Sequence, residues 1–151
     1  MSQRRDVIKV LIDNLKLIDG TRSPLGSYSF KTNLHENVFR GFKTIEEIND
    51  FPSIYMVAGS EARTYNTVGT SQSSLALMIR VYTYDEEDKF INEHINDIVQ
   101  DIEHVVYNLP RTYSNLEILD ITIVSINTDE GLLTPYGIVE LQIQARYEVT
   151  L

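Results

Sequence analysis

Residues 139–149 alternate apolar and polar side chains without a break. The apolar positions are Val139, Leu141, Ile143, Ala145, Tyr147 and Val149, and the positions between them are Glu140, Gln142, Gln144, Arg146 and Glu148. Successive side chains of a β-strand point to opposite faces of the sheet, so this strand has one buried face and one wet face. A slip of one residue would expose every apolar side chain. The segment therefore fixes its own register and the side on which the core must lie.

Further strand patterns precede this segment. Residues 53–58 (SIYMVA) form an apolar run that is typical of a buried strand, and a shorter strand is predicted over 35–42. Residues 116–126 are rich in β-branched side chains, which favour strands. A further strand is predicted over 74–84, where Leu75, Leu77, Ile79 and Val81 form one apolar face. Within 116–126, Leu119, Ile121 and Ile123 share a face.

Two other segments follow helical periodicity, with apolar residues three and four positions apart. The first is expected to end at Asp19-Gly20, and the second to begin with the acidic residues 85–88 and to end at 108–110. Their apolar positions are Val7, Ile8, Leu11, Leu15 and Ile18, and Ile91, Ile95, Ile98, Ile102 and Val105. Acidic residues at a helix start complement the positive end of the helix dipole. A capping box at Thr44 and Glu47 predicts a helical turn between them.

This order of elements predicts an α+β fold, a mainly antiparallel sheet with two amphipathic helices packed on one face. With 151 residues and 42% hydrophobic composition, the chain is expected to form a single domain over 1–151. The segment 111–115 is expected to be a linker. No apolar run reaches the length of a membrane span and the start lacks a signal peptide, so we expect a soluble intracellular protein.

Composition excludes several kinds of site. The chain has no cysteine, which excludes disulfides, thiolate metal sites and cysteine nucleophiles. Its net charge of −9 argues against a surface that grips phosphates. Such a protein can still surround DNA without holding it, because like charges repel.

No catalytic constellation stands out. His94 and His104 are ten residues apart and lie on different faces of the predicted helix, which argues against a shared metal ion, and the glycine-rich nucleotide and nucleophile motifs are absent. The acidic residues 85–88 together with Asp120 suggest the ligands of a Mg²⁺-dependent nuclease. The alternative is that the first group stabilises a helix start and that Asp120 faces solvent. We therefore expect no enzyme, no metal and no cofactor.

Two long connections join strands. Residues 59–74 are polar, and the spacing of Ala62, Thr64 and Tyr65 suggests a projecting β-arm. Residues 127–137 (NTDEGLLTPYG) place Leu132 and Leu133 between two predicted turns. These leucines either cover their own sheet or contact another subunit, and the residues alone leave both readings open.

The segment 121–149, above all TDEGLL and PYG, resembles the C-terminal region of tail terminator proteins of long-tailed bacteriophages. The resemblance implies a structural virion protein that forms a hexameric ring on the head-proximal end of the tail tube. Such a ring ends tube polymerisation and receives the head or neck. The implied partners are identical subunits, the tail tube protein and a head-completion protein, with DNA passing through the channel without specific binding. The implied location is the virion tail, and the host cytoplasm during assembly.

The resemblance also implies interface positions. These are the residues of the matching segment, Asp129, Glu130, Leu132, Leu133 and Tyr136. As a hypothesis, the 59–74 arm, with Arg63 and Tyr65, reaches toward the tube or its lumen. Another neck or head-tail connector protein remains the alternative within the virion, and the metal-dependent nuclease remains the alternative outside it.

Overall fold

A computed structural model describes residues 3–65, 69–85, 91–113, 116–129 and 135–150. The fold is α+β, as the sequence predicts. The elements in chain order are α1 (Gln3–Leu15), β1 (Val38–Arg40), the 3₁₀ helix η1 (Ile45–Glu47), β2 (Ser53–Tyr65), β3 (Thr70–Tyr84), α2 (Ile91–Tyr107), β4 (Thr112–Tyr113), β5 (Leu116–Thr128) and β6 (Tyr136–Thr150).

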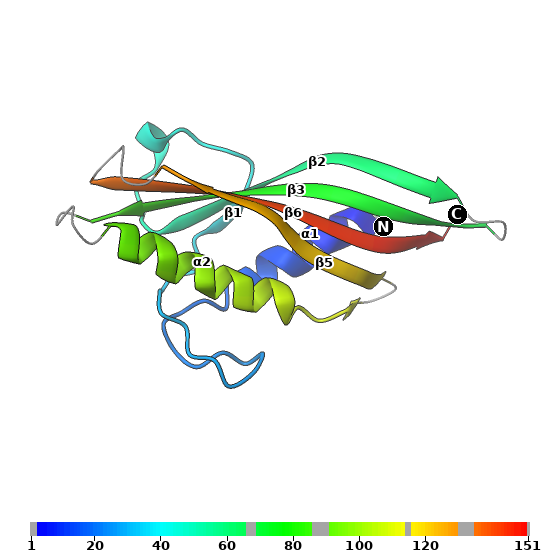
Figure 1. Cartoon of the computed structure of the whole chain (residues 1–151), viewed down its shortest axis with the longest axis horizontal. Helices are drawn as coiled ribbons and strands as arrows, with labels where there is room; N and C mark the ends of the chain where they lie inside the picture. The colour runs from blue at the N-terminus through cyan, green and yellow to red at the C-terminus, as the bar shows by residue number, and fades with distance from the viewer. Residues whose placement is uncertain (1–2, 66–68, 86–90, 114–115, 130–134, 151) are drawn as a thin grey trace.

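The strands form one six-stranded sheet in the order β1-β2-β3-β6-β5-β4. β1 runs parallel to β2, and the other neighbouring strands are antiparallel. In Figure 1 the ribbons of α1 and α2 both lie below the sheet. Gln3 donates a hydrogen bond to the carbonyl oxygen of Glu148 (2.9 Å), so the two ends of the described chain meet at one end of the molecule.

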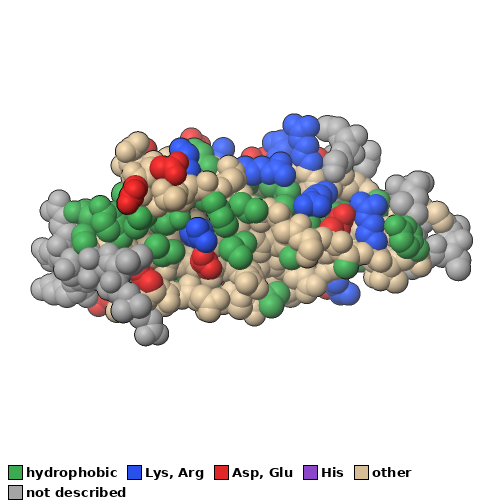
Figure 2. Space-filling model, turned by 90° about the horizontal axis from the view of Figure 1, so that it is seen from above, with side chains coloured by type: hydrophobic (Ala, Val, Ile, Leu, Met, Phe, Trp, Pro, Cys, Tyr) green, Lys and Arg blue, Asp and Glu red, His purple; other side chains and the backbone are tan. Residues whose placement is uncertain are grey.

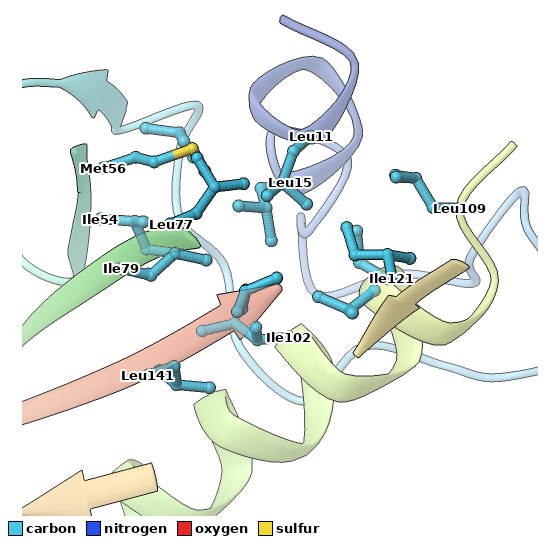
Figure 3. Close-up of a cluster of buried hydrophobic side chains, with 14 of the residues drawn as sticks. Leu11, Leu15, Ile54, Met56, Leu77, Ile79, Ile102, Leu109, Ile121 and Leu141 are labelled. Carbon is cyan, nitrogen blue, oxygen red and sulfur yellow. The ribbon is translucent and has the colours of Figure 1, made fainter. Parts of the chain in front are cut away.

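One hydrophobic core fills the space between the sheet and the two helices. Figure 3 shows side chains of α1, α2, β2, β3, β5 and β6 meeting there. The alternating faces predicted from the sequence are buried in full: Leu75, Leu77, Ile79 and Val81 of β3, and Val139, Leu141, Ile143, Ala145, Tyr147 and Val149 of β6. β6 pairs with β3 along its whole length, which places these two apolar faces side by side.

The prediction for β5 is wrong at Leu119. Leu119 is 38% exposed, and its neighbour Ile118 is 2% exposed and takes the place in the core. The register between β5 and β6 shifts between Ile118 and Asp120, and shifts again between Ile123 and Ser125. A bulge of this kind reverses the alternation of side chains, so a strict period of two assigns the wrong face to residues beyond it.

The connection between β2 and β3 is a long antiparallel hairpin, which agrees with the expected β-arm. The strands continue to Tyr65 and begin again at Thr70, well beyond the apolar runs that marked them in the sequence. Apart from Ala62 and Tyr65, the paired residues between Ala62 and Ser74 are polar, and Ser71 and Ser73 are buried. Serines on the inward face removed the apolar alternation by which the sequence could have shown the strands.

Other boundaries differ by a few residues. α1 ends at Leu15, and a tight turn carries the chain to Ile18, whose N–H donates to the carbonyl oxygen of Leu15 (3.2 Å). The predicted linker after α2 contains β4, which pairs with the start of β5. The expected start of the second helix at 86–88 lies outside the described residues. At η1 the Glu47 carboxylate accepts a hydrogen bond from the Thr44 hydroxyl (2.9 Å).

Candidate interaction surface

The face of the sheet that lies away from the helices carries charged side chains that are paired with one another. Figure 2 looks down on this face. Arg80 of β3 donates to Glu140 of β6 (2.9 Å), and Arg146 of β6 donates to Asp120 of β5 (2.7 Å). The hydrogen bonds from Arg146 hold the pKa of the Asp120 carboxyl below its usual value. Each pair is a cross-strand contact in which the two charges neutralise one another.

Between these ion pairs lies an open hollow of about 560 Å³. No lining residue is charged. The hollow is lined by Phe42, Val57, Gly59, Ser60, Ala62, Ser74, Ala76, Leu77, Met78, Val124, Gln142, Ile143 and Gln144. Val124 is 61% exposed, which is a large fraction for a β-branched aliphatic side chain in a strand. Hydrophobic side chains are visible across the middle of this face in Figure 2.

The loop after β1 covers one part of the same face. The guanidinium of Arg80 lies 4.4 Å from the centre of the Phe42 ring, which is a cation–π distance, and the Tyr82 hydroxyl donates to the carbonyl oxygen of Lys43 (2.7 Å). Below the loop, Ile48, Tyr55 and Tyr82 form a small second core. The loop therefore seals part of the outer face and leaves the hollow open beside Phe42.

The predicted interface residues lie at the end of the β5–β6 hairpin, as far as the structure describes them. Tyr136 contacts Tyr84 and Phe51, with ring centroids 5.1 Å and 5.7 Å from its own. The backbone N–H of Asp129 donates to the carbonyl oxygen of Ile138 (3.2 Å). Glu130, Leu132 and Leu133 lie outside the described residues. Asp129 and Tyr136 are thus at one end of the sheet, and the hollow is in its middle.

The residues predicted for the arm lie at the opposite end of the molecule. Tyr65 is 68% exposed, and Arg63 forms an ion pair with Glu61 (3.2 Å). Glu61 also accepts a hydrogen bond from the buried Tyr147 hydroxyl. Burial, followed by this bond to a carboxylate, raises the pKa of Tyr147. The arm is therefore tied to β6 at its base and exposes an aromatic ring near its tip.

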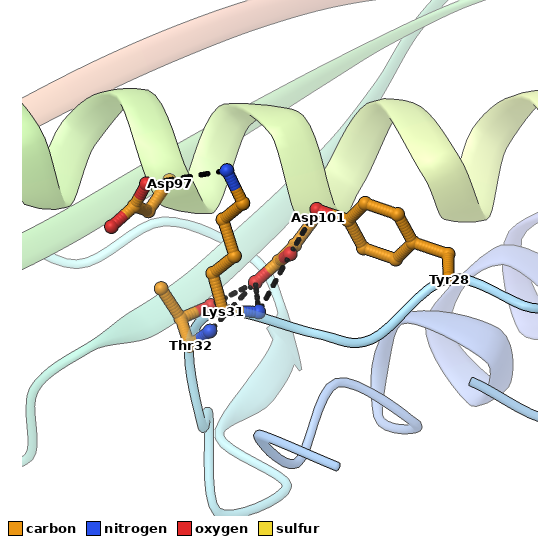
Figure 4. A network of polar contacts seen from close by, with 5 residues as sticks. All are labelled: Tyr28, Lys31, Thr32, Asp97 and Asp101. Carbon is orange, nitrogen blue, oxygen red and sulfur yellow. Dashed lines mark hydrogen bonds and ion pairs between the residues drawn. The ribbon is translucent and has the colours of Figure 1, made fainter. Parts of the chain in front are cut away.

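A buried carboxylate in α2 holds the long loop 19–34 against the helix (Figure 4). Asp101 is fully buried and accepts hydrogen bonds from the Tyr28 hydroxyl (2.7 Å), the Lys31 N–H (3.0 Å), and the N–H and hydroxyl of Thr32 (2.8 and 2.6 Å). Burial, and then the bond to Asp101, raise the pKa of Tyr28. The sequence analysis missed this residue. The available signal was an acidic residue three positions after Ile98, within the apolar stripe of the helix.

The two helical histidines have separate partners. His104 lies 2.8 Å from the Ser23 hydroxyl and stacks on Tyr28 with centroids 4.5 Å apart, whereas His94 is paired with Asp85 at 2.8 Å. Within the described ranges, no group of three or more His, Asp or Glu side chains could hold a metal ion.

No helix in the same ranges is long and apolar enough to cross a membrane.

The acidic residues weighed as nuclease ligands do not come together where they are described. Asp85 directly follows Tyr84, the last residue of β3. Asp120 pairs with Arg146 of β6, and Arg146 pairs with Ser74 of β3, which precedes Tyr84 by ten residues. Ten residues of strand correspond to about 33 Å. The Asp120 carboxylate moreover accepts a hydrogen bond from Arg146. These two carboxylates therefore cannot share a metal ion.

Comparison with known proteins adds three findings. A family model described as "Bacteriophage Tail Tube Terminator Protein" matches residues 1–150. The tail tube terminator protein p142 of Escherichia phage T5 is 32% identical over 98% of this chain and 95% of its own length. A chain in a solved structure titled "Virion of native gene transfer agent (GTA) particle" has the same fold, with a TM-score of 0.58, 13% identity, and coverage of 91% of this chain and 92% of that chain.

Proposed function

Because the chain belongs to the bacteriophage tail tube terminator family, a family of structural tail proteins, we propose that it forms a six-membered ring on the head-proximal end of the tail tube. The ring ends tube polymerisation and presents the surface on which the head or neck docks. The match of the family model to residues 1–150, together with the T5 relative, is the observation that carries this proposal.

The distribution of the predicted residues supports a head-to-tail contact between subunits. A closed ring needs two different patches on each subunit, because the first patch of one subunit docks on the second patch of its neighbour. We assign one patch to the end of the β5–β6 hairpin, with Asp129, Glu130, Leu132, Leu133 and Tyr136. The exposed Tyr84 beside Tyr136 adds aromatic surface to it.

The arm is the proposed contact with the tube. Tyr65, near the described end of β2, is exposed, and aromatic side chains are enriched at protein interfaces. The charges favour a channel that releases DNA. The net charge is −9, and Arg80 and Arg146 on the outer face are each paired with a carboxylate, so they are poorly placed to hold phosphates.

Electron microscopy of the purified protein mixed with tail tubes tests this function. A ring at the head-receiving end, and at no other place on the tube, is the expected result. Infection with phage that lack the gene provides an independent measurement and should give tubes of abnormal length. Tails of normal length that fail to join heads would instead assign the protein to the neck or the head-tail connector.

A further inference from the structure

The uncharged lining of the outer-face hollow restricts what could bind there. Arg80 and Arg146 at either side are committed to ion pairs with Glu140 and Asp120. A third cation, Arg4, donates a hydrogen bond to the carbonyl oxygen of the lining residue Gly59 (3.0 Å). A phosphate or an acidic peptide would find no unpaired cation in this lining. An apolar, uncharged segment would bury Val124, Met78 and Phe42 without leaving a charge desolvated.

The chain itself carries a segment of this kind. Residues 131–135, GLLTP, have no charge and contain adjacent leucines. The segment is bounded by Asp129, whose N–H is bonded to Ile138, and by Pro135, whose carbonyl oxygen accepts from the Asp85 N–H (2.9 Å). The described residues on either side, Asp129 and Pro135, are therefore both held at the end of the sheet.

The backbone of this segment cannot reach the hollow of its own subunit. Six Cα–Cα steps of about 3.8 Å connect Asp129 to Pro135, so a loop with both ends held extends at most about 11 Å beyond them. Gln144, in the hollow, lies nine residues along β6 from Pro135, or about 30 Å. Val124, at the near rim, is still five residues or about 16 Å from Asp129.

We infer that the hollow of each subunit receives residues 131–135 of a neighbouring copy. The inference rests on the proposed ring and supplies the receiving site that a head-to-tail contact needs. Donor and receiver are different patches of one chain, one at the end of the sheet and one in the middle of its outer face. Such a contact repeats from copy to copy around a ring.

Disulfide crosslinking tests the contact directly, because the chain has no cysteine of its own. The variant Leu132→Cys with Ala76→Cys is assembled on tail tubes and oxidised. Ala76 points outward from β3, so the substitution leaves the core intact. We expect crosslinked multimers of this chain up to the size of the ring. The matched control is Leu132→Cys with Tyr107→Cys, at an exposed position at the end of α2, and should remain uncrosslinked.

A charge exchange covers the case in which the cysteine variant fails to assemble. Ala76→Glu should lose capping activity, Tyr107→Glu should keep it, and Leu132→Lys combined with Ala76→Glu should recover part of it. Rings of the double-cysteine variant that crosslink no better than the control, a crosslink from position 76 to another virion protein, or normal capping by Ala76→Glu would each overturn the inference. These outcomes leave the ring in place, whereas failure of the unaltered protein to form rings on tubes would overturn the proposed function.

Discussion

Asp101 has more hydrogen bonds to its side chain than any other carboxylate in the described part of the chain, and all of its partners come from one loop. The Tyr28 hydroxyl and the backbone N–H groups of Lys31 and Thr32 are partly buried, and they would lose their acceptor if this carboxylate were lost. This site was only weakly indicated beforehand, because a single acidic residue in an apolar stripe does not identify its partners. Those partners are about seventy residues away in the chain.

Replacement of Asp101 by Asn tests the anchor with little change in shape. We expect the free energy of unfolding to fall by about 2 kcal/mol, because a buried acceptor is exchanged for a donor that faces other donors. Urea denaturation followed by circular dichroism measures it. Asp97→Asn is the control. Asp97 is partly exposed, and its carboxylate lies as far as 3.9 Å from the Lys31 ammonium, so this surface ion pair should contribute little to the free energy of unfolding. Equal effects of the two substitutions would contradict the assignment.

The pair of Asp120 and Arg146 should make stability depend on pH. The pKa of Asp120 is lowered in the folded protein, so its contribution is present above the pKa of the unfolded chain and is lost as pH falls through the folded value. Asp120→Asn should therefore be less stable than the unaltered protein at neutral pH, and the difference should shrink as the pH falls below about 4. Thermal unfolding across this range measures it. A difference that grew at low pH would have the wrong sign for this pair.

Among the elements, β3 and β6 were predictable and β5 and the arm were only partly so. The apolar side chains alternate without interruption from Leu75 to Val81 in β3 and from Val139 to Val149 in β6, and the two strands pair in a single continuous register. In β5 the bulges exchange Ile118 for Leu119, and no property of either residue reveals the shift. The hollow was not predictable, because it is made by segments far apart in the chain, including Phe42 and Val124.

Gly137 links the PYG motif to the packing of α2 on β6. A Cβ atom there would lie 2.6 Å from the Thr83 hydroxyl and 2.9 Å from the Ile95 side chain. Gly137→Ala should therefore lower the free energy of unfolding by about 1–3 kcal/mol through overpacking. Chemical denaturation measures the change. Gly26→Ala is the matched control, because its added Cβ would meet only His104, at an ordinary distance of 3.8 Å. A neutral Gly137→Ala would show that α2 can shift to make room.

The whole molecule places its candidate contacts at different positions along one sheet. The β5–β6 turn lies at one end, the arm at the other, and the hollow between them. The family could be recognised from the sequence because its motif is contiguous. The relation among these surfaces could not, because it depends on the pairing of β2, β3, β6 and β5 in one sheet.

The arm provides a prediction at this scale. Tyr65→Ser should leave the thermal unfolding temperature unchanged, since the ring is mostly exposed, and should weaken capping of tail tubes if the tip contacts the tube. Electron microscopy of tubes at limiting protein concentration measures the capped fraction. Tyr107→Ser, at an exposed ring on α2, is the control and should cap normally. Unchanged capping by Tyr65→Ser would remove this side chain from the contact.

The hydrogen bond between Gln3 and Glu148 brings the beginning and the end of the described chain together, away from the β5–β6 turn. A label attached to either extremity would consequently mark the same pole of every subunit. If the proposed annulus forms, gold particles coupled there should appear on one of its rims, and their side relative to the tail tube would show the orientation of each copy.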